Sequence, residues 1–319
     1  MLGGTGWVGR HIVDALRARG DHVLVVARHR APHVPEGMFR AFDLATATPG
    51  TIADLLRRTR AGVVINATDG ANTNDGWDRP ESALARVNVH AVHCLLAGIG
   101  LLRRRPRLVQ IGTIHEYGPV APGTLIDETV PPRPSSAYAA TKLAGSTAVL
   151  EAARSGAVDG LVLRLANVCG PHPSPASFPG KLLRLVLSAG AGAEVTLPLA
   201  AASRDFIDVR DVAVASLRAA DAGVTGRALN IGSGVAVEIR DFVARFLAVA
   251  GLRPGALNEE QLPVPSMGGD WVRTDIRLAE QLLGWRPQIG LEDSLREMWE
   301  AARPGSHTEV RPSARRAGR

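Results

Sequence analysis

The sequence has 319 residues, enough to bury a large core as one big domain or two closely packed ones. Its 45% hydrophobic and 21% charged residues are typical of a globular protein, and its net charge of +6 is modest. Aromatic residues make up only 4% of the chain, so stacking surfaces are scarce and we expect no nucleic-acid partner.

Cysteine usage and hydropathy bear on the compartment. Cys94 and Cys169 stand alone, without the spacing of a disulfide framework or a metal site. The chain shows no charged-then-apolar leader and no apolar run of about 18 residues. We therefore expect a cytoplasmic protein with no membrane partner and no bound metal.

The chain begins with a glycine-rich stretch, Gly3–Gly9, in which glycine recurs at every third position. A helical pattern follows, and an apolar run over 23–26 predicts a strand. Glycines at this spacing let the backbone approach a pyrophosphate, and the helix start at Trp7–Val8 offers free N–H groups to it. The sequence thus predicts a dinucleotide-binding turn, with a glycine-rich surface turn as the alternative.

The first strand of this unit is expected to be truncated. A dinucleotide-binding unit needs a strand before its glycine loop, but only Met1 and Leu2 precede Gly3. We hypothesise that the chain as given begins a few residues late, which should lower both cofactor affinity and stability.

The end of the next strand bears on the choice between the two nicotinamide cofactors. An acidic residue there binds the ribose 2′-hydroxyl of NAD, whereas a cation accommodates the 2′-phosphate of NADP. Ala27 stands at this position and is followed by Arg28, His29 and Arg30. The sequence therefore predicts NADP(H), with NAD(H) as the alternative if these arginines are merely surface charges.

Strands and helices alternate along the chain as far as Asn167, which predicts an α/β fold with a doubly wound, parallel Rossmann sheet. Ligands of such sheets bind at the carboxyl ends of the strands, where Gly3–Gly9, Thr113 and Asn167 fall. The expected strands are 62–66, 107–112 and 161–166, and the expected helices are 50–60, 80–102 and 136–154.

Prolines and glycines break up the chain after Asn167, which predicts a smaller, irregular substrate-binding portion. Two segments, 204–209 and 228–231, are expected to return to the main sheet as strands. Residues 304–319 are rich in Arg, Ser, Pro and Gly and are expected to form a disordered basic tail. The dinucleotide-binding domain then comprises 1–167 and 203–232, the substrate-binding portion 168–202 and 233–303, with helices near 238–250, 275–283 and 291–302.

Tyr138 and Lys142 are the candidate catalytic pair. Lys142 is one of only two lysines among 37 basic residues, so an ammonium is retained where arginine serves elsewhere. Residues four apart share one helix face, which brings the phenol and the ammonium together. A cation roughly 5 Å away stabilises a phenolate by about 3 kcal/mol, lowering its pKa by around two units. The pair then acts as a general acid or base; core packing of Tyr138 is the alternative.

Several ordered motifs together resemble the extended short-chain dehydrogenase/reductase family, the group of nucleotide-sugar epimerases, dehydratases and reductases. The resemblance covers roughly residues 1–302. Its carriers are Gly3, Gly6 and Gly9, Asp43-Leu44, Thr113 in GTIHEYG, Tyr138 with Lys142, Asn167 in RLANVCGP, Arg204 to Val209, Asn230 in LNIGSG, and Leu283 to Pro287.

The resemblance implies roles for individual residues. Thr113 corresponds to the catalytic hydroxyl that hydrogen-bonds the reacting oxygen, Tyr138 to the proton donor or acceptor, and Lys142 to the residue that lowers its pKa. Asn167, Arg204 and the neighbouring His115 are expected on the substrate side. The predicted cofactor contacts are Gly3, Gly6, Trp7, Val8, Gly9, Arg28, Arg30, Asp43 at the adenine, Leu44, Asn66, Ala67, Asn88 and Lys142.

The substrate-side residues have alternatives. Arg204 is expected to bind a phosphate of a nucleotide diphosphate, because guanidinium suits bidentate phosphate binding. A salt bridge to Asp205, Asp208 or Asp211 is the alternative for this arginine. His115 could equally be an ordinary loop histidine.

Departures from the family pattern narrow the function. Dehydratases carry an Asp-Glu pair directly after the catalytic Thr, where this chain has Ile114 and His115, so dehydration is excluded. Ala27 replaces the acid usual in NAD-retaining epimerases, which favours a reductase that exchanges NADPH. Ser266-Met267 stand near the position of a second phosphate-binding Arg, which weakens the nucleotide-diphosphate assignment.

We therefore expect an NADPH-dependent ketoreductase acting on a nucleotide-activated 4-keto-6-deoxy sugar, with dTDP as the favoured nucleotide. The alternatives are an NAD-dependent nucleotide-sugar epimerase, a reductase of a non-sugar ketone, and a non-catalytic cofactor-binding protein. Helices 81–102 and 136–154 are apolar around much of their circumference, so a homodimer built on them is expected.

Overall fold

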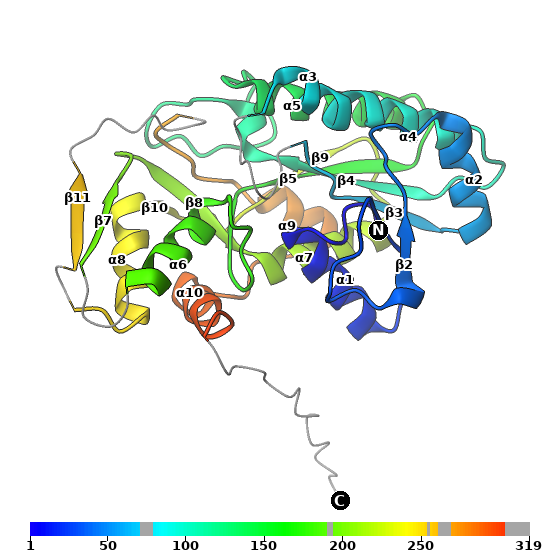
Figure 1. The fold of residues 1–319 in the computed structure, drawn as a ribbon. Coiled ribbons are helices and arrows are strands. Elements are labelled where there is room, and N and C mark those ends of the chain that lie inside the picture. Colours follow the sequence, from blue (N-terminus) through cyan, green and yellow to red (C-terminus); the bar gives the residue numbers. More distant parts are fainter. Residues whose placement is uncertain (71–78, 190–193, 254–255, 261–268, 304–319) are drawn as a thin grey trace, which may run out of the picture.

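A parallel sheet forms the centre of the protein in the computed structural model (Figure 1). Four strands lie in the order β3-β4-β5-β9, and β1 and β2 form a parallel pair beside them. The strands are β1 (Val25–Ala27), β2 (Phe39–Ala41), β3 (Val63–Asn66), β4 (Arg107–Thr113), β5 (Gly160–Leu165) and β9 (Ala228–Ile231). The described residues are 1–70, 79–189, 194–253, 256–260 and 269–303.

Met1 and Leu2 lie in the place of the expected first strand, between β1 and β3. Leu2 forms parallel bridges to both Val26 and Asn66. Its N–H donates to the carbonyl of Ile65 at 2.9 Å, and its carbonyl accepts from Ala67 N at 3.0 Å. These two residues therefore join the β1-β2 pair to the other strands of the sheet.

Helices cover both faces of the sheet, as doubly wound folds require. One face carries α1 (Trp7–Arg19), α7 (Val209–Asp221) and α9 (Arg277–Leu283). The other carries α2 (Pro49–Thr59), α3 (Glu81–Ala85), α4 (Ala91–Gly100) and α5 (Ala137–Arg154).

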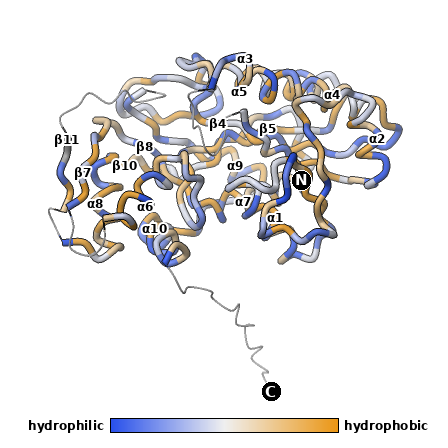
Figure 2. The backbone as a smooth tube through the Cα atoms, viewed as in Figure 1, coloured by the Kyte–Doolittle hydropathy of each residue, from blue (hydrophilic) through white to orange (hydrophobic). Residues whose placement is uncertain are grey.

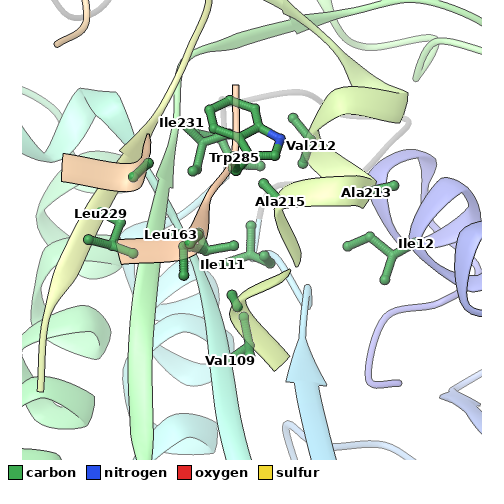
Figure 3. Close-up of a cluster of buried hydrophobic side chains, with 14 of the residues drawn as sticks. Ile12, Val109, Ile111, Leu163, Val212, Ala213, Ala215, Leu229, Ile231 and Trp285 are labelled. Carbon is green, nitrogen blue, oxygen red and sulfur yellow. The ribbon is translucent and has the colours of Figure 1, made fainter. Parts of the chain in front are cut away.

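Strand side chains alternate between two cores. Ile65 packs with α1 and α7, whereas its neighbour Val64 packs with α2 and α4. In the first core, Trp285 packs with Ile111 and Ile231 (Figure 3). Figure 2 shows hydrophobic residues following the central strands where the helices meet them. The predicted α/β fold with a parallel Rossmann sheet is confirmed.

The predicted helix 80–102 is not regular throughout. A π-helical turn at Arg86–His90 separates α3 from α4. By length and hydropathy the stretch Glu81–Gly100 would suffice to cross a membrane. It packs instead against α2 and α5 in the helix layer of the fold.

A second, smaller portion has its own core, built from the segments after β5. β8 pairs with β6 in parallel and with β10 antiparallel, and β11 pairs with β7. Phe206, Phe242 and Phe246 lie at the centre of this core. Its elements are β6 (Asn167–Cys169), β7 (Val195–Pro198), β8 (Ser203–Asp208), β10 (Ala236–Glu238), β11 (Leu257–Glu260), α6 (Phe178–Ala189), α8 (Ile239–Val249) and α10 (Leu291–Glu300).

Two expectations about this region are wrong. Segment 204–209 forms β8 but does not join the main sheet, because β9 occupies the edge of β5 and β8 pairs with β6 instead. Residues 277–285 lie within the range assigned to the substrate-binding portion, yet Leu283 and Trp285 belong to the core beneath the main sheet. The predicted tail 304–319 and Ser266-Met267 lie outside the described residues.

Candidate active site

The glycine loop is shaped by contacts that exclude side chains. Gly3 has φ +76°, and a Cβ on it would lie 2.7 Å from the carbonyl oxygen of Ala67. A Cβ on Gly9 would lie 2.1 Å from the carbonyl oxygen of Gly3. Helix α1 begins at Trp7 with Gly6 as its N-cap and no side-chain cap. The N–H groups in the first turn of α1 lie next to glycine backbone that carries no side chains. This arrangement suits the binding of the diphosphate of a dinucleotide.

Trp7 also has a structural role that the sequence did not indicate. Its indole Nε1 donates to the carbonyl oxygen of Pro171 at 2.9 Å, and His11 Nε2 lies 3.0 Å from the same oxygen. Since Pro171 follows β6, these contacts fix the start of α1 against the segment that leads into the smaller portion.

The residues predicted at the adenosine end lie beside the loop but differ in exposure. Arg28 and Arg30 are exposed just after β1, and Arg30 donates to the carbonyl of Val34 at 2.9 Å. Asp43 accepts a hydrogen bond from Ala45 N at 3.0 Å, which closes a local turn, and Leu44 is buried. Both arginines therefore remain accessible to a 2′-phosphate.

Asn66 and Asn88 are used within the protein. Asn66 donates to Gln110 Oε1 at 2.8 Å and accepts from Thr68, which shapes the end of β3 beside Ala67. Asn88, in the π-helical turn, donates to Thr141 Oγ1 at 3.1 Å and accepts from Gly70 N at 2.9 Å. Asn88 therefore ties the segment after β3 to α5, so its side chain serves to position the site.

Thr113 and Lys142 lie at the carboxyl end of β4, and Tyr138 lies one turn before Lys142 on α5. Thr113 is the last residue of β4, and Ser136 caps α5 by accepting from Ala139 N, which sets the first turn of the helix. Lys142, buried on α5, donates through Nζ to the carbonyl of Ile111 at 2.7 Å, two residues before Thr113. Tyr138 is buried on the same helix, so side chains of β4 and α5 meet at this edge.

The expected lowering of the Tyr138 pKa is not observed, which corrects the sequence-based argument. The pKa of Tyr138 is raised well above 10.0, first by burial and then by the charge of Asp69. The phenol donates to Asp69 Oδ2 at 2.8 Å. Asp69 is itself exposed, so an anion at the mouth of the site holds the buried phenol protonated.

His115 and Arg204, both predicted on the substrate side, lie close together. Burial, followed by the charge of Arg204, lowers the pKa of His115 to about 4. His115 is therefore neutral at pH 7. Asn167 lies beside β8 and donates to the carbonyl of Asp205 at 3.3 Å.

The contacts described for Arg204 are with backbone carbonyls and with the charge of Asp270, and the three carboxylates proposed as alternatives have other described partners. Its guanidinium donates to the carbonyls of Ser203, at 3.0 Å, and Gly269. Asp205 accepts from Ser233, Gly234 and Thr274, Asp208 pairs with Arg210, and Asp211 accepts from Gln288 N and Ile289 N.

Two residues of the site were missed. Asp69 lies in a polar segment where no sequence pattern marks it. Glu116 carried a signal, because Thr113-x-x-Glu116 is the spacing of a capping box, and both of its hydrogen bonds are formed. Arg164 was a second signal, because a charged residue inside an apolar strand needs a buried partner, which here is Glu116.

Known proteins match this chain over nearly its whole length. Residues 1–232 match the NAD dependent epimerase/dehydratase family. A dTDP-6-deoxy-L-talose 4-dehydrogenase (NAD(P)(+)) from Kitasatospora kifunensis is 34% identical over 307 residues, covering 94% of both chains. A GDP-6-deoxy-D-mannose reductase from Pseudomonas aeruginosa is 29% identical, covering 94% of this chain and 96% of that protein.

A solved structure also resembles this chain over nearly its whole length. The UDP-glucose 4-epimerase of Thermus thermophilus, in complex with NAD, superposes with a TM-score of 0.81 at 26% identity. The match covers 94% of this chain and 97% of that chain.

The Rossmann sheet and the glycine loop define a dinucleotide-dependent enzyme. The chain belongs to the NAD dependent epimerase/dehydratase family, within the extended short-chain dehydrogenase/reductases. It is a nucleotide-sugar-modifying enzyme, and its relatives use NAD or NADP. The predicted family and the prediction of an enzyme are confirmed, and the non-catalytic alternative is set aside.

Proposed function

We propose that the protein is an NADPH-dependent ketoreductase that reduces the 4-keto group of a nucleotide-activated 6-deoxy sugar, with dTDP as the nucleotide. The observation that supports the proposal is that Tyr138 and Lys142 lie one turn apart on α5, with Lys142 bound to the end of β4 that carries Thr113 and with the Tyr138 phenol as a hydrogen-bond donor. A reductase needs a proton donor in its resting state, and this phenol is one.

The cofactor preference rests on the adenosine end of the site. Ala27 offers no carboxylate to a ribose 2′-hydroxyl, and the exposed Arg28 and Arg30 supply positive charge next to it. A 2′-phosphate is therefore favoured over a free hydroxyl, which supports NADP(H) over NAD(H).

The residues divide the reaction between them. Bound NADPH supplies the hydride that adds to the keto carbon. Tyr138 donates its proton to the keto oxygen, and Thr113 Oγ1 shares that oxygen through a hydrogen bond. The ammonium of Lys142 stabilises the tyrosinate as its charge develops. The product is the secondary alcohol, and Tyr138 regains its proton from solvent on the side of Asp69.

The substrate class is supported by two relatives. One is named for dehydrogenating carbon 4 of a dTDP-6-deoxy sugar with NAD(P)+, and another for reduction to a GDP-6-deoxy sugar. Arg204 is a buried cation beside His115 and suits a phosphate of the nucleotide.

An epimerase is the second candidate, favoured by the structural match to an NAD-bound UDP-glucose 4-epimerase. Such an enzyme interconverts sugars without net use of cofactor, so cofactor consumption separates the two proposals.

We further propose a cytoplasmic homodimer, and the exposed sides of α4 and α5 support the dimer. Pro134, Ala140, Leu143 and Ala144 line a shallow groove there together with His93 of α4. Small and apolar side chains of this kind permit close packing of a second pair of helices. Sedimentation at micromolar concentration is expected to give a dimer, and a clean monomer would contradict it.

The test is a screen of nucleotide 4-ketosugars with NADPH and with NADH, following the loss of absorbance of the reduced cofactor and identifying the sugar product. We expect stoichiometric oxidation of NADPH with a dTDP-4-keto-6-deoxy sugar and slower oxidation of NADH. Sugar interconversion without cofactor oxidation would select the epimerase.

A further inference from the structure

Glu116 is a fully buried carboxylate directly beside the catalytic edge. It lies in the short 3₁₀ turn Ile114–Tyr117 that follows Thr113, and none of its side chain is exposed. Glu116 Oε1 accepts from the backbone N–H of Thr113 at 3.0 Å and from Ser146 Oγ at 2.8 Å. Glu116 Oε2 accepts from Arg164 Nε at 2.8 Å.

These three partners come from three different elements. Thr113 ends β4, Ser146 lies on α5, and Arg164 lies in β5. Ser146 follows Lys142 by four residues, so it lies on the same face of α5 as the catalytic residues. One carboxylate therefore connects the strand that carries the catalytic hydroxyl with the helix that carries the phenol.

The chain leaves room for this carboxylate at a glycine. A Cβ on Gly112 would lie 2.6 Å from Glu116 Oε1 and 3.2 Å from Ser146 Oγ. Its distance to Val162 Cγ1 would be 2.9 Å, so neither side offers space. Only glycine at this position lets the carboxylate lie against the backbone of β4.

Burying a charge is costly unless it is paired and hydrogen-bonded. Glu116 is paired with Arg164, whose guanidinium lies 4.5 Å from the centre of the Tyr117 ring. Tyr117 in turn donates to Asn230 Oδ1 at 2.9 Å, which anchors the pair to β9. The carboxylate is thus held from several sides, which makes it a rigid reference point for the edge of the sheet.

We propose that Glu116 is a positioning residue of the catalytic step: its carboxylate fixes the end of β4 relative to α5, so that Thr113 and Tyr138 converge on one substrate oxygen. The proposal rests on the proposed function for its effect on turnover. It also claims that Glu116 protects the Thr113 amide from hydrogen exchange, and this exchange is measured without substrate.

Two double variants separate the acceptor oxygen from the charge. Glu116→Gln/Arg164→Met removes both charges but keeps an oxygen that accepts from Thr113 N. Glu116→Ala/Arg164→Met removes the charges and the acceptor together. Ser146→Ala removes the bond of the same carboxylate to α5 and leaves its bond to Thr113. Each variant is compared with the wild-type full-length chain for cofactor affinity and circular dichroism.

The Gln/Met variant is expected to keep kcat within about threefold of wild type. Ser146→Ala is expected to lose more than this, because the link to α5 is removed, while its Thr113 amide stays protected. The Ala/Met variant is expected to lose at least about tenfold in kcat with KM and cofactor affinity within about twofold, because small misplacements of a catalytic group are costly. In hydrogen exchange, the Thr113 amide is expected to remain protected in the Gln/Met variant and to exchange at least about tenfold faster in the Ala/Met variant.

Equal exchange of the Thr113 amide in the two folded double variants overturns the proposal. If the Ala/Met variant does not fold, the Gln/Met variant decides alone: rapid exchange at Thr113, or a tenfold loss of kcat, overturns the proposal. If the wild type reduces no ketosugar, the proposed function fails, and the exchange data still decide whether Glu116 positions Thr113.

Discussion

The glycine loop follows Leu2 on one side of β3 and the catalytic edge ends β4 on the other side, yet they are built in different ways. The loop depends on residues without a Cβ, because a Cβ on Gly9 would collide with the backbone of Gly3. The edge is defined by buried polar groups, with Tyr138, Lys142 and Glu116 each donating to or accepting from a distant segment. Backbone shape makes one site, and side-chain networks make the other.

This difference predicts different failures. A side chain added to the loop should weaken cofactor binding without changing the chemistry of the bound complex. Removing a polar group from the edge should lower turnover and leave cofactor binding intact. Variants in the glycine loop and at the catalytic edge test whether cofactor binding and turnover can be changed separately.

The largest effect is expected at the edge, from Tyr138→Phe. Losing the proton donor should lower kcat by at least about a hundredfold, because general acid catalysis contributes that much or more. NADPH affinity, measured by fluorescence titration, should stay within about twofold. Tyr117→Phe is the matched control, since Tyr117 donates to Asn230. Near-normal turnover in Tyr138→Phe would defeat the catalytic assignment.

A side chain in the loop should have the next largest effect. Gly9→Ala places a Cβ 2.1 Å from the carbonyl of Gly3, so the loop must shift. We expect the Kd for NADPH to rise at least about tenfold, since the backbone no longer fits the diphosphate. Gly100→Ala, where nothing lies within 4 Å, is the control and should bind normally. Unchanged affinity in Gly9→Ala would show that the loop does not hold the cofactor.

The neutral state of His115 should appear in stability. Its pKa is lowered from 6.5 to about 4, so its contribution is present above pH 6.5 and is lost as the pH falls towards 4. Between pH 7 and 5, wild type should lose about 2 kcal/mol more unfolding free energy than His115→Gln. Urea titrations at both pH values measure this difference. Parallel losses in both proteins would place His115 in contact with solvent.

The smallest effect concerns Asp69. Its charge raises the pKa of Tyr138, and reduction needs the protonated phenol, so activity is lost as the pH rises through that pKa. Asp69→Asn should move this alkaline loss of kcat to lower pH. The comparison is a pH–rate profile of both proteins in the reductive direction. An unmoved alkaline limb would mean that Asp69 does not influence the phenol during turnover.

Local patterns made the glycine loop and the placement of Tyr138 and Lys142 on one helix predictable. Each depends on residues within a single turn or helix, so spacing alone carried the signal. The hydrogen-bond partners of the catalytic edge could not be predicted in this way, because they lie far away in the sequence. Asp69 contacts Tyr138 across 69 residues of sequence, and Arg164 contacts Glu116 across 48. The sign of the Tyr138 pKa shift was wrong for this reason, because burial and Asp69 dominate it.

Strand pairing was unpredictable for a related reason. Segments β8 and β9 both look like buried strands, and nothing in their composition says which one will pair with β5. The outcome depends on β6, which continues from β5 beyond Ala166 and offers β8 a separate partner. Competition between two strands for one edge is a property of the whole fold.

The most direct test of the account uses NADPH carrying deuterium at carbon 4 of the nicotinamide, on the face that is transferred, with a dTDP-4-keto-6-deoxy sugar as substrate. Mass spectrometry and NMR of the product locate the label. The account predicts one deuterium at carbon 4 of the sugar and one NADPH consumed for each alcohol formed. An altered sugar without deuterium, with the NADPH intact, would contradict it.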